Sequence, residues 1–137
     1  MIELSFEYWN KLAGQLIITC AFLSGFSIAV TANLLISKAS GKLYRAILKA
    51  STISSGSFLV TVFALTDILM RTTEGFPGDV THEVLNKPRL VGLTTYVIGI
   101  VSLLTVIGLS GWTKSKGTGI FTTVVSIVTF LLILIFL

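Results

Sequence analysis

Most of the residues that could have a chemical role lie in one segment, residues 38–70: KASGKLYRAILKASTISSGSFLVTVFALTDILM. Charged and small side chains form a row along it. At about 100° per residue on a helix, one face of this stretch contains Lys38, Lys42, Arg45, Lys49, Thr52, Gly56, Val60, Phe63 and Asp67. The face is basic at one end, small and apolar in its middle, and acidic at the other end. In an oligomer it is suited to line an ion pore, in which a ring of Asp67 attracts cations, Val60 and Phe63 form an apolar constriction, and the basic residues line an inner vestibule.

The layout of residues 38–70, including the segment LYRAILKAS (residues 43–51), resembles the pore helix of the Orai calcium channels. Those channels are also four-span proteins, and their pore helix has a basic inner segment, a hydrophobic middle and an acidic filter. The resemblance covers this stretch alone, on the second rather than the first apolar segment, with the aspartate one residue out of register. As an analogy of layout, it implies a pore-lining role for this helix and a filter role for Asp67.

The same residues have a second interpretation, in which they orient the helix and contact lipid. Lysine and arginine just inside a span set the orientation of any membrane helix, and a basic amphipathic segment binds anionic lipid headgroups. Asp67 lies four residues before Arg71, which is the spacing of an ion pair on a helix. Both interpretations stay open at the level of sequence.

The elements that must position these residues are membrane helices. Of the 137 residues, 53% are hydrophobic and 12% are charged, and the mean hydropathy is +0.94, far from the averages of a soluble domain. Apolar runs at residues 16–37, 52–70, 90–112 and 119–137 are each close to the length that spans a hydrocarbon core. They are continuous rather than alternating, which favours helices over a barrel. The sequence predicts an all-α, polytopic membrane protein, a bundle of four transmembrane helices in one membrane domain over residues 1–137.

Charges in the connecting segments predict which side of the membrane each segment occupies. The first connection is basic, and Lys114 and Lys116 make the third one basic, whereas residues 71–89 balance acids against bases. Because basic loops stay in the cytoplasm, we expect both chain ends outside, in a bacterial inner membrane or another plasma membrane. Acids and a lysine before the first run also indicate that it is retained as a helix rather than cleaved as a signal peptide.

The middle connection is expected to be a small loop on the outer surface. Asp79 or Thr81 is placed to cap a short helical turn through Leu85, which Pro88 then stops. His82, the only histidine, is expected to be a solvated loop residue, because a metal site needs more ligands than this loop offers.

The first apolar run carries a row of small residues. Ala21, Gly25, Ala29 and Asn33 recur every four residues and form one stripe on a helix. Small residues let membrane helices approach closely, and a polar amide bonds across the contact, so this stripe predicts a helix-packing surface whose partner lies in the same chain or in another copy. Cys20, the only cysteine, is expected to be a small buried packing residue.

Several functional classes are excluded or disfavoured. The spans hold no paired carboxylates, Ser–His pair or other reactive set, so we expect neither an enzyme nor a cofactor or metal site. The net charge of +4 does not indicate nucleic-acid binding, because the cations gather in short loops, where topology explains them. A homo-oligomeric channel or pore remains, gated by a protein partner at the basic cytoplasmic loops. The alternatives are a non-catalytic accessory or scaffold subunit and, less favoured, a small transporter.

Overall fold

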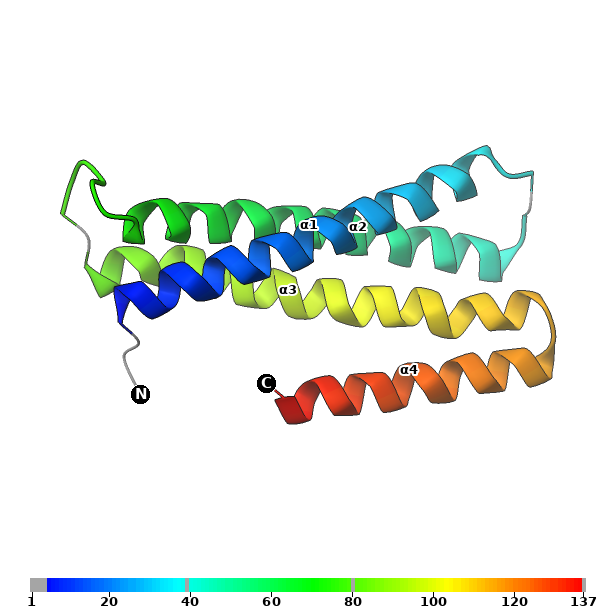
Figure 1. Ribbon diagram of the computed structural model, residues 1–137. Helices are drawn as coiled ribbons and strands as arrows, with labels where there is room; N and C mark the ends of the chain where they lie inside the picture. Colours follow the sequence, from blue (N-terminus) through cyan, green and yellow to red (C-terminus); the bar gives the residue numbers. More distant parts are fainter. Residues whose placement is uncertain (1–4, 39, 80, 137) are drawn as a thin grey trace.

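The computed structural model describes residues 5–38, 40–79 and 81–136 and folds them into four long α-helices. The helices are α1 (Phe6–Ile36), α2 (Lys42–Thr72), α3 (His82–Ser110) and α4 (Lys116–Phe136), and a short 3-10 helix, η1 (Gly111–Thr113), joins α3 to α4. Successive helices run in opposite directions along the long axis of the molecule (Figure 1). No strand occurs in these described ranges, so the prediction of an all-α, four-helix fold is confirmed.

Each of the four helices is long and apolar enough to cross a membrane. At 1.5 Å per residue, the 31-residue helices α1 and α2 are about 46 Å long, which exceeds a hydrocarbon core of about 30 Å. Both helices therefore begin about ten residues before the apolar runs that the sequence shows, and α2 also ends after its run. At the start of α1, the Tyr8 amide donates a hydrogen bond to the Ser5 hydroxyl at 3.2 Å, which caps the helix ahead of its first apolar run.

The basic segment is helical from Lys42 onward. Gly41 precedes it with a φ of 123°, a conformation that glycine adopts without steric cost. From there α2 runs without interruption to its end, which confirms that the basic helix continues into the second apolar run. Lys38 lies before the helix, so the helical row of cations consists of Lys42, Arg45 and Lys49 rather than four residues.

The start of α3 differs from the prediction. The Val84 amide donates to the Thr81 hydroxyl at 3.4 Å, so Thr81 caps the helix as expected. The helix does not stop at Pro88, however, but continues through it to Ser110. Pro88 lacks the amide that would bond to the Val84 carbonyl, yet membrane helices tolerate one such loss where neighbouring helices support them. Here Leu85, buried one turn after the cap, packs α3 into the core.

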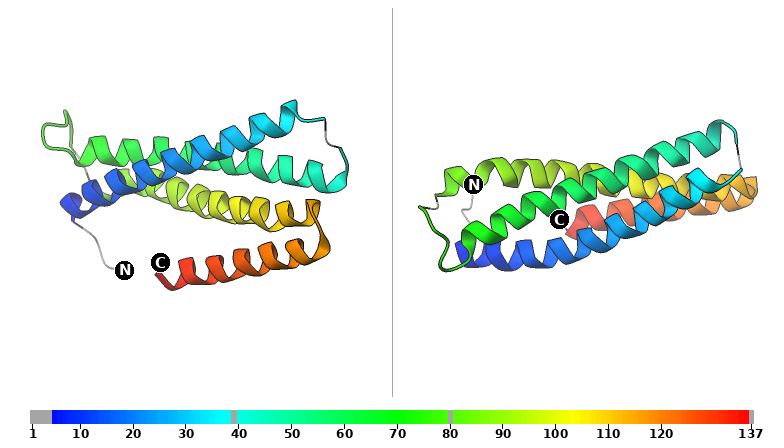
Figure 2. Two further views of the ribbon diagram at one scale, coloured as in Figure 1. Left: turned by 45° about the vertical axis from the view of Figure 1, so that its right-hand side comes forward. Right: turned by 90° about the horizontal axis from the view of Figure 1, so that it is seen from above.

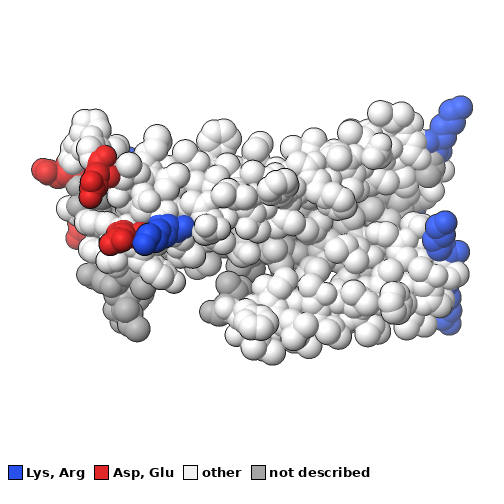
Figure 3. Space-filling model, viewed as in Figure 1, with Lys and Arg blue, Asp and Glu red and all other residues white. Residues whose placement is uncertain are grey.

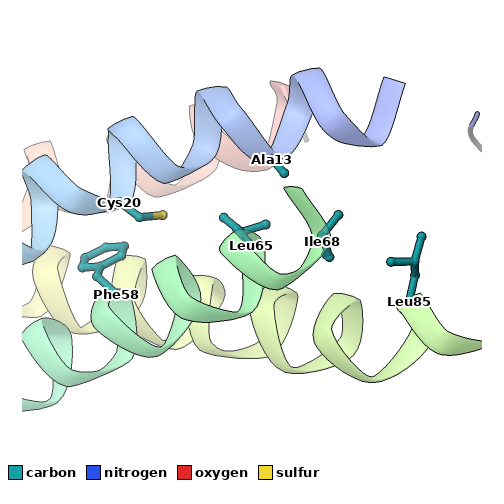
Figure 4. Close-up of a cluster of buried hydrophobic side chains, with 6 residues drawn as sticks. All are labelled: Ala13, Cys20, Phe58, Leu65, Ile68 and Leu85. Carbon is teal, nitrogen blue, oxygen red and sulfur yellow. The ribbon is translucent and has the colours of Figure 1, made fainter. Parts of the chain in front are cut away.

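The core lies among the first three helices, with α2 packed against both α1 and α3. Its fully or nearly buried hydrophobic residues are Ala13, Cys20, Phe58, Leu65, Ile68 and Leu85. Figure 4 shows Ala13 and Cys20 on α1 directed toward the side chains of α2. Cys20 is 0% exposed, which agrees with its predicted role as a packing residue.

The fourth helix lies at the edge of the bundle, against α3 and η1 (Figures 1 and 2). Its contact is made by glycines and hydroxyls: the Thr122 hydroxyl donates to the Gly108 carbonyl at 3.0 Å, and the Trp112 indole Nε1 donates to the Thr123 Oγ1 at 2.9 Å. Of its residues, only Gly119 and Ser126 are buried within the described part of the chain. Most of the apolar surface of α4 therefore faces outward, as expected of a helix surrounded by lipid.

Candidate functional site

The outward face of α2 brings together the residues that the sequence singled out. The opposite face of this helix supplies its buried residues: Ile47, Ser51, Ser54, Phe58, Thr61, Leu65 and Ile68. At about 100° per residue, the row from Lys42 to Asp67 lies roughly half a turn away from them. Val60 is 45% exposed and Phe63 is 70% exposed, so this row points away from α1 and α3.

The eight residues Lys42, Arg45, Lys49, Thr52, Gly56, Val60, Phe63 and Asp67 are called the outward α2 face below. All of them are exposed except Asp67, which is partly buried. No side chain packs on Gly56, because a β-carbon placed there would meet nothing within 4 Å. A single chain therefore leaves this face available to lipid, to another protein or to other copies of itself.

Charges separate to the two ends of the molecule (Figure 3). The basic end carries Lys38, Lys42, Arg45, Lys49, Lys114 and Lys116, and the mixed end carries the acids Glu7, Asp67, Glu74, Asp79 and Glu83 together with Lys11, Arg71, Lys87 and Arg89. Two ion pairs occur among the described residues, Lys11–Glu7 and Arg71–Asp67, and both lie at the mixed end. The cations of the basic end consequently have no carboxylate near them in the described part of the chain.

Asp67 is paired with Arg71 one helical turn further on. The Arg71 Nε donates to both carboxylate oxygens, at 3.1 Å to Oδ1 and 3.0 Å to Oδ2. The Asp67 side chain is 38% exposed and the Arg71 side chain is 32% exposed. On its other side the Arg71 guanidinium lies over the Phe76 ring, 5.8 Å from its centroid. Sequence analysis left two interpretations of Asp67 open, a carboxylate that acts as an ion filter and a carboxylate paired with Arg71. The ion pair is present in the structure.

Next to this pair, an open cleft with a volume of about 730 Å³ lies at the mixed end, between the first turns of α1 and the loop after α2. One of its walls is fixed by Asn10, whose Nδ2 donates to the Leu69 carbonyl at 3.1 Å and to the hydroxyls of Thr72 and Thr73 at 3.2 and 3.0 Å. Asn10 thus caps the carboxyl end of α2 from another helix. Sequence analysis missed this role, because no local pattern relates residues so far apart in the chain.

His82 lies at the first position of α3 rather than in a solvated loop. Its ring stacks on Phe6 of α1, with centroids 4.7 Å apart, and Arg89 similarly lies over the Trp9 ring at 5.5 Å. The prediction of a solvated histidine was wrong, because the turn that Thr81 caps is the start of a long helix that packs this residue against Phe6 of α1. Within residues 5–38, 40–79 and 81–136, no three metal-ligating side chains gather in one place.

The centre of the bundle is closed by hydroxyl groups that bond to one another. Ser27 and Ser54 lie 3.1 Å apart between their Oγ atoms, and the Oγ1 of Thr31 lies 2.6 Å from the Oγ of Ser51. Between α2 and α3, the Ser54 hydroxyl donates to the Gly99 carbonyl at 3.3 Å. Such bonds hold membrane helices together. These hydroxyl groups satisfy each other inside the core of one chain.

The predicted packing stripe of α1 lies on the surface of the single chain. Ala21, Gly25, Ala29 and Asn33 are all exposed, and a β-carbon at Gly25 would meet nothing within 4 Å. The face that packs on α2 lies nearly opposite this stripe, with Ala13, Cys20, Ser24 and Ser27 as its buried residues. The stripe is therefore available for contact with a helix from outside this chain.

No protein family, curated protein or solved structure matches this chain in sequence or fold. The similarity of residues 38–70 to the layout of an Orai pore helix consequently rests on those residues alone.

Proposed function

We propose that the protein is a subunit of a homo-oligomeric ion channel in which the outward α2 face lines the pore. The observation that carries this proposal is the position of that face: one continuous helix places cations, small residues, apolar residues and an ion pair in a single row directed away from the core. A pore wall needs such a row. The centre of the single chain is closed by its own hydroxyls, so the conducting path lies between copies.

In this arrangement the parts of the row have different roles. Phe63 and Val60 protrude and form an apolar constriction that gates by excluding water. Gly56 and Thr52 form a wider, more polar segment, and Lys49, together with the cations before it, lines the inner vestibule. The basic end is also where a protein partner or anionic lipid would bind and alter the gate.

The α1 stripe supports assembly of the copies. Its small residues are exposed and allow another helix to approach closely. Gly25→Leu would place a large side chain in the middle of this stripe, so it should reduce the oligomer to smaller species. Gly56→Leu is a control for the bulk of the new side chain, because it changes the wall of the pore and leaves the α1 stripe intact.

The first experiment is the mass of the purified protein in nanodiscs, measured by native mass spectrometry. A closed oligomer of four or more copies is the expected result, and ion currents in planar bilayers should follow. Phe63→Ser should then increase the current by admitting water to the constriction, whereas Phe121→Ser, at a similarly exposed position of α4, should not. A strictly monomeric protein would overturn the proposal.

A non-catalytic accessory or scaffold subunit is the second candidate, and the Asp67–Arg71 pair favours it. Because Asp67 is neutralised by Arg71 of the same helix, its presence in the span is explained without a role in an ion pathway. The apolar residues of the outward α2 face also suit contact with lipid. In that case the basic end contacts anionic lipids or a partner protein. Recovery of one copy bound to a different membrane protein would support this candidate. A small transporter is least favoured, since the core hydroxyls are already bonded to one another.

A further inference from the structure

Resting on the proposed channel, we infer that its permeant ion is an anion. Asp67 is the one carboxylate on the outward α2 face, and it is neutralised by an ion pair with Arg71 of the same chain. The remaining charges along the outward α2 face are Lys42, Arg45 and Lys49, all positive. The sum over the pore wall of every copy is therefore positive.

The position of Arg71 is fixed from two sides. Its Nε donates to both oxygens of Asp67 at 3.0 and 3.1 Å, and its guanidinium lies over the Phe76 ring. A charge held in this way cancels most of the field of the carboxylate at the mouth of the pore. Arg71 is thus the residue that determines selectivity at the outer end, and it does so by neutralising Asp67.

The basic end supplies the attractive field. The three cations lie on successive turns of α2, over about 10 Å of helix, and no carboxylate pairs with them in the described residues. Repeated around a ring of copies, they produce a positive potential in a narrow, low-dielectric passage. Such a passage concentrates anions, and rings of lysine and arginine are the usual lining of anion pores.

The test is the reversal potential of the reconstituted full-length protein in planar bilayers with asymmetric potassium chloride. The wild type should reverse near the chloride equilibrium potential. Arg71→Gln should free Asp67 and shift the reversal potential toward that of potassium, whereas Asp67→Asn should leave it at, or closer to, the chloride value. Lys49→Gln should also reduce the preference for chloride. Lys87→Gln, at the mixed end and off the outward α2 face, is the matched control and should leave the value unchanged.

The outcomes separate the two proposals. No current from a correctly assembled wild type would overturn the channel itself. A current carried by potassium would overturn the anion inference and leave the channel standing. An unchanged reversal potential in Arg71→Gln would likewise overturn the inference. Arg71→Lys, which keeps the charge, should retain wild-type selectivity, and native mass spectrometry of each variant establishes that the oligomer is intact.

Discussion

The ring of Phe58 on α2 lies directly against the backbone of Gly99 on α3. A β-carbon at position 99 would be 2.9 Å from Cε1, 3.0 Å from Cδ1 and 3.1 Å from Cζ of this ring. Phe58 is 0% exposed, and its ring also meets Tyr96 edge-on, with centroids 6.4 Å apart. Glycine at position 99 is therefore what allows α2 and α3 to approach this closely.

Gly99→Ala should destabilise the bundle by about 1–3 kcal/mol, the usual cost of an added group in a well-packed core. The measurement is reversible unfolding of the detergent-solubilised protein, followed by circular dichroism. Gly56→Ala is the matched control in the same bundle, because its β-carbon would enter open space. Equal stability of the two variants would contradict the close contact. Phe58→Leu should recover part of the loss when it is combined with Gly99→Ala.

The hydrogen bond between Ser27 and Ser54 should contribute modestly to the packing of α1 on α2. A double-mutant cycle with both serines changed to alanine should give a coupling free energy of about 0.6 kcal/mol, the average for such bonds inside membrane proteins. The Oγ atoms lie 3.1 Å apart and are buried. Thr94, whose exposed hydroxyl bonds to the Leu90 carbonyl of its own helix, should show no coupling with Ser54.

Gly111→Ala should displace α4 from α3. A β-carbon there would collide with the Thr122 side chain and lie 2.6 Å from the Thr118 carbonyl oxygen. The displacement should break the bond from the Trp112 indole to Thr123 and shift the Trp112 emission, measured in a Trp9→Phe background. Gly117→Ala, in the first turn of α4 and next to open space, should leave the emission unchanged. A shift of similar size in both variants would argue against a specific clash.

The charge separation predicts the orientation of the chain in the membrane. In a Cys20→Ala background, Asp79→Cys should react with an impermeant thiol reagent added outside intact cells. Ser40→Cys, exposed at the basic end, should react only after permeabilisation, because basic connections stay in the cytoplasm. Labelling of Ser40→Cys by reagent added outside would contradict this orientation and indicate the opposite one. Neither substitution changes the cations that determine the orientation.

The sequence by itself determined how many helices the chain forms and where they lie. Long apolar runs can satisfy their backbone groups in a membrane only as helices, so composition and length were enough. The division into a basic end and a mixed end followed from the charges of the connecting segments. Pro88 was misjudged, because the rule that proline stops a helix comes from local geometry, whereas α3 is held through that point by contacts with its neighbours.

Only the tertiary structure decided which face of each helix lies inside. In a soluble protein the polar face marks the outside, but both faces of a membrane helix are apolar, so periodicity alone does not distinguish them. Two different faces of α1 contain small residues. The row with Ser24 and Ser27 packs on α2, because hydroxyls there find partners, and the row with Gly25 is left outside. The Asp67–Arg71 pair, in contrast, needs only the helix, because the two residues lie four apart on α2. The loop after α2 adds the contact of the Arg71 guanidinium with the Phe76 ring.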